Sequence, residues 1–289
     1  MEKLIQYCTN ASLYDGEFGG SFGWPAAGMG YIIVSENGKL IVIDGGYGDD
    51  AENILSLLCE NSNAETPHVD LWIVTHPHFD HYGALRELAS NPNFNQRLII
   101  EKVIYWFPLE FVGKDGKARN LETACQKMDL IISGFNSEAY RPTRGEKINI
   151  DSIEVEFLFV PDDCSYLNTG GGNANLVSLI FTVKTKNKKI MFTGDAYGRT
   201  MQITAWRYKG SLACDILQMP HHGLCDAYNI DFCREVNAKT VLIPISAAGY
   251  REMHGEQYAD KEGRNHNLWA ENNAETVYKA FEGTVEIEL

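Results

Sequence analysis

The chain has 289 residues, and 44% of them are apolar, which is enough for one large α/β domain with a sizeable core. Its formal net charge of −14 makes long nucleic acids poor partners, because binding to them depends on Lys and Arg at the phosphates. The seven cysteines are scattered, odd in number and without a CxxC pair, which argues against a disulfide framework. No apolar run approaches the roughly 20 residues that span a bilayer. We therefore expect a cytoplasmic protein that acts on a small molecule without a membrane, and the sequence does not indicate its oligomeric state.

Residues 28–76 predict two strands, a helix and a third strand. In GYIIVSENGKLIVIDGG, an Asn-Gly turn separates two apolar runs, which is a strong hairpin signal, and the second run ends at Asp44. Apolar residues at helical spacing predict a helix over 50–60. The apolar run VDLWIVTH then predicts a buried strand that delivers His76 at its end.

The rest of the chain alternates further strand-like runs with helical segments. The strand-like runs are RLIIEKVIYWF, KINIDSIEVEFLFV, NLVSLIFTVK, KKIMFTGD, CDILQMPHHG and TVLIPIS. Helices are predicted around residues 82–90, 121–134, 198–209, 227–236 and 270–281. Several strands end in polar residues, so loops at one edge of a layered α/β fold are expected to gather them. No repeat or long linker divides the chain, and residues 1–289 are expected to form one domain.

The segment THPHFDH, residues 75–81, holds three of the eight histidines and one aspartate. His76 and His78 are two residues apart, so on an extended segment both can point to one side, whereas Asp80 and His81 approach from the next turn. Imidazole and carboxylate groups are ligands for zinc, manganese and iron(II). The spacing therefore predicts a site for two neighbouring metals. The alternative is a set of histidines that cap a helix or lie on a polar loop.

Two later strands end in the groups that such a site would still lack. Asp195 follows a buried strand in IMFTGDAYG, and His221 and His222 follow another in ILQMPHHGL. A two-metal site needs a bridging carboxylate and one more imidazole, and these residues could supply both. Alternatively, Asp195 caps a helix and the histidine pair packs in a loop.

In order and context, VIDGG, THPHFDH, TGDA and PHHG resemble the motifs of the metallo-β-lactamase-fold hydrolases. The resemblance covers about residues 28–250 and implies a four-layer αββα sandwich with metals held by loops at one edge of the sheets. It implies two divalent metal ions, with zinc expected and manganese or iron as alternatives. Asp44 resembles the family's structural aspartate, which steadies the metal loops. The implied metal ligands are His76, His78, Asp80, His81, Asp195 and His222.

One histidine of the family pattern is missing, because none lies between His81 and His221. The segment GGNANLVSLIF stands in its place. Here the chain resembles the hydrolase domain of competence DNA-uptake channels and the choline-phosphate esterases of the same fold, in which an Asn-containing segment replaces the histidine. This resemblance implies that Asn175 binds substrate, with direct ligation of the first metal as a further reading. The alternative for Asn173 and Asn175 is a glycine-rich turn that caps a strand.

The resemblance also implies a reaction and a role for each histidine of PHHG. His222, next to the glycine, corresponds to the metal ligand, and His221 corresponds to a substrate contact or acid, although the reverse assignment stays open. Asp80 is the acidic residue expected beside a metal-bound hydroxide, as its orienter or base. We predict a metal-dependent hydrolase of a phosphodiester or related phosphoryl compound. The alternatives are an acyl hydrolase acting on lactones or thioesters, and a redox or non-catalytic metal-binding member.

The remaining histidines give weaker signals. His68 precedes a buried strand, and His254 and His266 lie in a polar segment, so we expect all three at the surface or in loops. The aromatic-rich segment FGGSFGWPAAGMGY is expected to pack in the core or in a hairpin. The alternative is that this segment and Tyr47 together line the mouth of a pocket.

Overall fold

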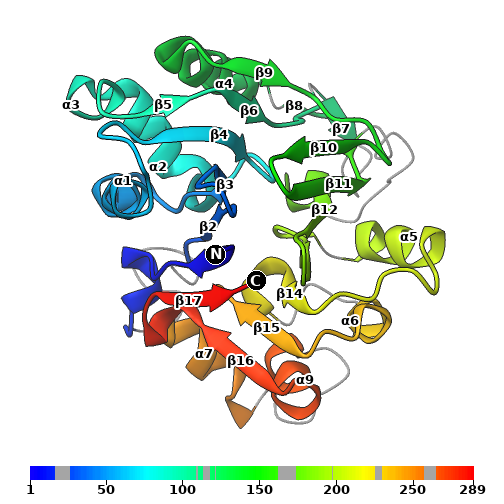
Figure 1. Ribbon diagram of the computed structural model, residues 1–289. Helices are drawn as coiled ribbons and strands as arrows, with labels where there is room; N and C mark the ends of the chain where they lie inside the picture. The colour runs from blue at the N-terminus through cyan, green and yellow to red at the C-terminus, as the bar shows by residue number, and fades with distance from the viewer. Residues whose placement is uncertain are drawn as a thin grey trace.

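The computed structural model describes two β-sheets that stack face to face, with helices on both outer faces (Figure 1). This arrangement confirms the predicted four-layer αββα sandwich. The described residues are 1–16, 27–108, 110–112, 118–120, 122–161, 174–196, 198–224, 230–256 and 265–289.

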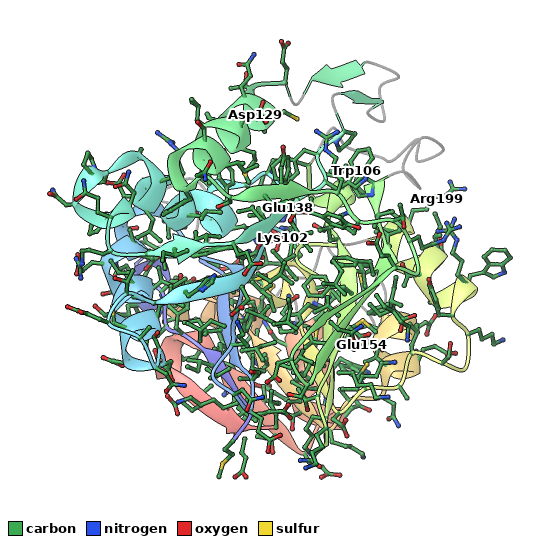
Figure 2. All side chains as sticks on the ribbon, turned by 45° about the horizontal axis from the view of Figure 1, so that its top comes forward. Lys102, Trp106, Asp129, Glu138, Glu154 and Arg199 are labelled. Carbon is green, nitrogen blue, oxygen red and sulfur yellow. The ribbon has the colours of Figure 1, made fainter. Side chains whose placement is uncertain are left out.

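The first sheet joins both ends of the described chain and has the strand order β17-β1-β2-β3-β4-β6-β9, with β5 beside β4. Neighbouring strands from β17 to β3 are antiparallel, and those from β3 to β9 are parallel. An ion pair of 3.3 Å between Lys102 of β6 and Glu138 of β9 links the last two strands (Figure 2). The strands are β1 (Lys3–Gln6), β2 (Gly30–Val34), β3 (Leu40–Asp44), β4 (His68–Ile73), β5 (Ile99–Ile100), β6 (Lys102–Ile104), β9 (Glu138–Tyr140) and β17 (Val285–Glu288).

The second sheet has the strand order β10-β11-β12-β13-β14-β15-β16. Its first four strands are antiparallel neighbours, and β13 to β16 run parallel. The strands are β10 (Lys147–Ile150), β11 (Ile153–Phe159), β12 (Ile180–Lys184), β13 (Lys189–Phe192), β14 (Ile216–Gln218), β15 (Thr240–Ile243) and β16 (Thr276–Lys279). A separate antiparallel pair consists of β7 (Glu110–Val112) and β8 (Ala118–Asn120).

Three apolar clusters hold the four layers together. One lies between the sheets and includes Ile43 and Phe181, a second packs the first sheet against α1, α2 and α4 around Trp72, and the third packs the second sheet against its helices around Leu217. None of the described helices is long and apolar enough to cross a membrane. The helices are α1 (Ala51–Glu60), α2 (Phe79–Ser90), α3 (Pro92–Asn95), α4 (Glu122–Phe135), α5 (Arg199–Arg207), α6 (Ile230–Val236), α7 (Ala247–Met253) and α9 (His266–Asn273). Short 3-10 turns are η1 (Asn10–Leu13), η2 (Gly48–Asp50), η4 (Ala174–Val177), η5 (Pro220–Gly223) and η6 (Ala280–Glu282).

Most predicted elements are present, but the helix predicted over 270–281 is wrong. Helix α9 ends at Asn273, and the following TVYK forms β16, which extends the second sheet beside β15. Thr, Val and Tyr favour strands once a neighbouring strand is available, and this long-range pairing overrides the local helical spacing. The run KINIDSIEVEFLFV is a hairpin rather than one strand, since Asp151 between β10 and β11 has a φ of 54°. Residues 18–26, 227–229, Asn173 and Cys225 lie outside the described residues.

Parallel strands bring the polar strand ends to one edge of each sheet. In the first sheet, β3 ends at Asp44, and β4 leads into the THPHFDH segment. In the second sheet, β13 leads to Asp195 and β14 leads to PHHG. The two edges meet where the backbone N–H of Leu179 donates to the carbonyl of Thr75 at 3.0 Å. The fold thus collects the predicted site residues from both sheets.

Candidate metal centre

The THPHFDH segment connects β4 to α2 and presents its polar side chains to the second sheet. His76 is fully buried in the loop, and His78 is the residue that precedes the first turn of α2. Asp80 and His81 lie in that first turn. Because the turn separates them from the loop, the two pairs of side chains reach different parts of the same cluster, as the spacing predicted.

Asp44 anchors this segment from the end of β3. Its carboxylate accepts hydrogen bonds from the backbone N–H of Thr75 at 2.8 Å and from the Thr75 hydroxyl at 2.8 Å. The same carboxylate lies 2.8 Å from Nδ1 of His81. All three side chains are fully buried, so His81 is held by Nδ1 and its Nε2 is turned toward Asp195. Asp44 has a φ of 57°, a conformation that Asp tolerates better than most residues.

His222 is oriented from the second sheet in a similar way. Its Nδ1 lies 2.6 Å from the carbonyl oxygen of Pro244, which follows β15. Both His221 and His222 have positive φ values, of 45° and 54°. Such backbone conformations cost about 1–3 kcal/mol each and are typical of functional sites. The hydrogen bond from the backbone N–H of His221 to the carbonyl of Gly194, at 3.1 Å, helps to hold this turn.

Asp195 stands at the centre of the cluster, and its two carboxylate oxygens face different histidines. Oδ1 lies 3.2 Å from Nε2 of His81 and 3.3 Å from Nε2 of His222. Oδ2 lies 3.6 Å from Nε2 of His76 and 3.7 Å from Nε2 of His221. The carboxylate therefore faces two sets of nitrogen atoms at once.

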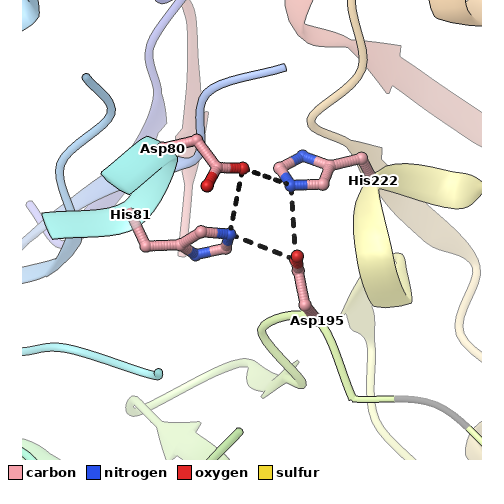
Figure 3. A group of neighbouring side chains, drawn as sticks. All are labelled: Asp80, His81, Asp195 and His222. Carbon is pink, nitrogen blue, oxygen red and sulfur yellow. Dashed lines mark ion pairs between the residues drawn. The ribbon is translucent and has the colours of Figure 1, made fainter. Parts of the chain in front are cut away.

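Two groups of candidate ligand atoms result, each with its atoms within 4.8 Å of one another. The first group consists of His76, His78 and Asp195. The second group consists of Asp80, His81, Asp195 and His222, and Figure 3 shows these side chains converging from α2 and from the loops of the second sheet.

The buried polar atoms of these groups fit a metal ion. Nε2 of His76, His81 and His222 and Oδ1 of Asp195 are buried without a hydrogen bond. Buried polar groups are nearly always hydrogen-bonded, so four such atoms within the two groups require an explanation. Neutral imidazole nitrogen and carboxylate oxygen are the donors that zinc, manganese and iron(II) take in proteins. The residues present are therefore a suitable donor set for divalent metal ions.

The electrostatics of the centre agree with that donor set. Burial lowers the pKa of His76 well below its usual range, which keeps this ring neutral. Burial acts in the same direction on His222, but the negative charges of Asp195 and Asp80 outweigh it and raise the pKa of His222 to about 10. Burial would raise the pKa of Asp195, but the charges of His222 and His81 outweigh it and hold that pKa well below its usual range. Without metal, the second group thus holds protons that a cation displaces on binding.

Asn175 and His221 lie together beside the first group. Asn175 is buried in η4, and its Nδ2 lies 2.9 Å from Nε2 of His221. The side chain of His221 is 11% exposed, against 3% for His222. The structure thus brings together the two residues for which the sequence implied a substrate contact, and it includes only His222 in a group of candidate ligands.

Sequence reasoning missed three groups that orient the centre. Thr75 holds Asp44, and the Pro244 carbonyl holds His222. Gln218 accepts hydrogen bonds from the backbone N–H groups of Thr193 and Gly194, at 2.7 and 2.8 Å, and so braces the turn before Asp195. Of these three groups, only Gln218 could have been noticed in the sequence, because it is a polar residue inside the buried strand that precedes PHHG.

The remaining predictions for polar residues had mixed outcomes. His68 and His254 are exposed, as expected, and lie 3.3 Å from Glu101 and 2.9 Å from Glu271. The prediction for His266 is wrong, because this residue is fully buried in the first turn of α9. The reason is that the Asn265 side chain caps α9 and donates to the Met253 carbonyl at 2.6 Å, which draws this helix start into the core.

Comparison with known proteins places the chain among similar sequences and folds. Residues 24–244 match the family model of the metallo-beta-lactamase superfamily. A protein of Escherichia coli K12, the uncharacterized protein YcaI, is 22% identical over 220 residues, which are 74% of this chain and 24% of that protein. The chain therefore spans about a quarter of the length of this relative.

Solved structures of low sequence identity have the same fold. The metallo-beta-lactamase fold protein YhfI from Bacillus subtilis is 13% identical and aligns with a TM-score of 0.58 over 99% of this chain and 100% of that one. Zinc-bound PqqB from Methylobacterium extorquens is also 13% identical, with a TM-score of 0.54 over the whole of both chains.

Proposed function

We propose that this chain, which belongs to the metallo-β-lactamase superfamily, hydrolyses a small phosphodiester or related phosphoryl compound. Members of this superfamily are mostly metal-dependent hydrolases. The centre for this reaction would hold two divalent metal ions, and residues 1–289 would act as one hydrolase domain. The orientation of Asp195 is the observation that carries the proposal, because its two oxygens face separate groups of nitrogen donors.

The proposed ligands follow the two groups. His76, His78 and Asp195 would hold the first ion, and the second would be held by the larger group that includes Asp80 and His222. The second group has four donors and the first has three, so we expect tighter binding at the second. Zinc suits a site rich in imidazole, and manganese and iron(II) accept the same donors.

Bound metal ions would supply a Lewis acid and would lower the pKa of water toward neutrality. Asp80 is the protein group best placed to accept a proton beside them. Its side chain is 20% exposed, against 2% for Asp195 and 3% for His222. Asp80 can therefore reach solvent or substrate while its Oδ2 lies 3.2 Å from Nε2 of His222.

His221 and Asn175 support a phosphoryl substrate. The two side chains are 2.9 Å apart, and His221 lies 3.7 Å from the shared carboxylate of Asp195. An imidazole and an amide side by side offer N–H donors, and a phosphoryl group presents several oxygens to such donors as charge develops on them. We therefore assign His221 and Asn175 to substrate binding, with His221 also able to donate a proton.

Metal analysis coupled to a substrate panel tests the proposal. The chelator-treated protein is reloaded with zinc, manganese or iron(II), its metal content is measured, and it is assayed against a phosphodiester, a phosphomonoester, a lactone and a thioester. We expect up to two ions per chain and activity highest on the phosphodiester. The His254→Ala variant is the control, because His254 is an exposed histidine outside both groups.

Each outcome decides one part of the proposal. Protein that contains no stoichiometric metal before and after reloading contradicts the metal centre. Metal-dependent activity that is highest on the lactone or thioester keeps the metal centre and contradicts the phosphoryl substrate. Hydrolysis that survives complete metal removal contradicts the role given to the ions.

A further inference from the structure

Residues of α2 and α4 line a groove of about 260 Å³. Both helices lie on the outer face of the first sheet (Figure 1). The α2 side of the groove contains Arg86, Ala89 and Ser90. Its α4 side contains Lys127, Leu130 and Ile131. We call these six residues the α2–α4 groove. None of them belongs to either group of candidate metal ligands.

Two large apolar side chains are exposed at the groove and beside it. Leu130 is 73% exposed although it lines the groove. Phe79, in the first turn of α2, is 45% exposed and stacks on Tyr82 with ring centroids 5.4 Å apart. Among the described residues, these are two of only six large apolar side chains that are this exposed. Apolar groups that adjoin a groove offer surface that a ligand can remove from water.

Two cations meet at one end of this surface. The Lys127 ammonium lies 4.6 Å from the centroid of the Phe79 ring, and the Arg86 guanidinium lies 5.5 Å from it. Within the described part of the chain, neither cation forms an ion pair with a carboxylate. The Asp129 carboxylate of α4, labelled in Figure 2, lies 3.4 Å from the hydroxyl of Tyr105 instead.

Arg86 and Lys127 thus place two positive charges beside one ring in a chain whose net charge is −14. The Phe79 ring stabilises each cation through its π face, but the two like charges repel each other. An anion between them would remove this repulsion and gain charge-assisted hydrogen bonds from both groups. The charge at this end of the groove is therefore complementary to a negatively charged head group.

We propose that the α2–α4 groove binds a small alkyl carboxylate, with its head group between Arg86 and Lys127 and its aliphatic tail against Leu130 and Ile131. The volume of about 260 Å³ is just below the range of sites for drug-sized ligands, so the ligand is small. The apolar lining residues are all aliphatic, which suits an alkyl chain. This proposal does not depend on the proposed hydrolase function.

Calorimetric titration of the full chain with octanoate tests the proposal. Acetate serves as the probe for the carboxylate head group alone, and octanol serves as the probe for the alkyl tail alone. We expect one octanoate per chain. Acetate should bind at least about tenfold more weakly, because it lacks the methylene groups that the groove buries. Octanol should also bind at least about tenfold more weakly, because it lacks the charge that Arg86 and Lys127 recognise.

Three variants connect binding to the groove. The Arg86→Gln/Lys127→Gln variant should weaken octanoate binding at least about tenfold. The Ser90→Tyr variant keeps both cations but fills the space between the helices, and it should weaken binding as well. The Arg199→Gln/Lys209→Gln variant is the matched control, because it removes two exposed cations, one in α5 and one just after it. Helix α5 lies away from α2 and α4 (Figure 1), so this variant should bind octanoate like the parent chain.

The outcomes separate the parts of the proposal. No octanoate binding at millimolar concentration, or equal binding by the parent chain and the Arg86→Gln/Lys127→Gln variant, overturns it. Equal affinity for octanol and octanoate overturns the role of the cations. Circular dichroism and thermal unfolding of each variant show that the fold is retained, which the surface position of these side chains favours.

Discussion

Nδ1 of His81 lies 2.8 Å from the carboxylate of Asp44, and both side chains are fully buried. The carboxylate cannot turn away, because it also accepts hydrogen bonds from the backbone N–H and the hydroxyl of Thr75. Nδ1 of His81 therefore carries a proton, and Nε2 is the ring nitrogen that faces Asp195 and that a metal ion would bind. Contacts of this kind orient histidine ligands and raise their basicity.

The Asp44→Asn variant should lower metal affinity at the second group by about 10–100-fold. An amide at this position can donate to Nδ1 of His81, which would move the ring proton to Nε2 and block the metal-facing nitrogen. Calorimetric titration of the chelator-treated variant with zinc measures the loss. The matched control is Asp49→Asn, since Asp49 is exposed a few residues away. Unchanged zinc affinity in Asp44→Asn would show that Asp44 does not set the state of His81.

The Asp195→Asn variant should lose metal from both groups together and should abolish hydrolysis. The amide removes the negative charge that lies between the two sets of histidines, so two cations would repel each other without a shared anion. Metal content per chain and turnover are measured on the same preparation. Asp231→Asn is the control, because the Asp231 side chain is 84% exposed. If Asp195→Asn kept one ion at full occupancy, the carboxylate would serve one group only.

Much of this centre could be predicted from the sequence, because its donors lie in a short segment and at the ends of strands. His76 to His81 span six residues, so their proximity needs no knowledge of the fold. Asp195 and the PHHG histidines were candidates because each follows a buried strand, and the resemblance to the metallo-β-lactamase-fold hydrolases implied the ligand roles of Asp195 and His222. The ligand roles of all these residues remain predictions until metal binding is measured.

The parts that sequence did not predict depend on contacts between distant segments. The Pro244 carbonyl orients His222 from 22 residues away, and a carbonyl has no signature in the sequence. Strands β1 and β17 pair the two ends of the described chain, and a local pattern does not encode such a partner. Strand β16 was predicted as helix for the same reason.

The metal-free protein should lose stability as the pH rises from about 6.5 to about 10. In the folded chain, the pKa of His222 is raised to about 10 by Asp195 and Asp80 against the effect of burial, from a reference value of 6.5. A group whose folded pKa is raised stabilises the fold fully below the unfolded pKa, and this contribution disappears as the pH passes the folded pKa. Thermal unfolding of chelator-treated protein across this interval should show a falling midpoint, and His222→Gln should flatten the decline.

Zinc binding should have the opposite pH dependence. Because the metal needs a neutral imidazole, binding at pH 8 should release at least one proton from the second group, and the affinity should rise with pH. Calorimetry in buffers of different ionisation enthalpy counts the protons released. Zinc binding at pH 8 without proton release would contradict the charged state assigned to His222.

The two histidines of PHHG should separate metal binding from turnover. The His222→Ala variant should lose metal from the second group, because Nε2 of His222 lies 3.2 Å from Asp80 and 3.3 Å from Asp195. The His221→Ala variant should keep its metals and lose mainly turnover, since His221 lies outside both groups of candidate ligands. A contact that strengthens in the transition state lowers kcat when it is removed.

The same pair of variants distinguishes phosphoryl from acyl substrates. If His221 binds a phosphoryl oxygen, His221→Ala should reduce phosphodiester cleavage more than any hydrolysis of lactones or thioesters. Metal content and kcat on both substrate classes are measured for the parent chain and for each variant, with His254→Ala as the control for loss of a histidine. Metal loss in His221→Ala with retention in His222→Ala would reverse the two roles. Full metal content and full turnover in both variants would exclude the PHHG turn from the reaction, because neither imidazole would then serve as a ligand or as a substrate contact.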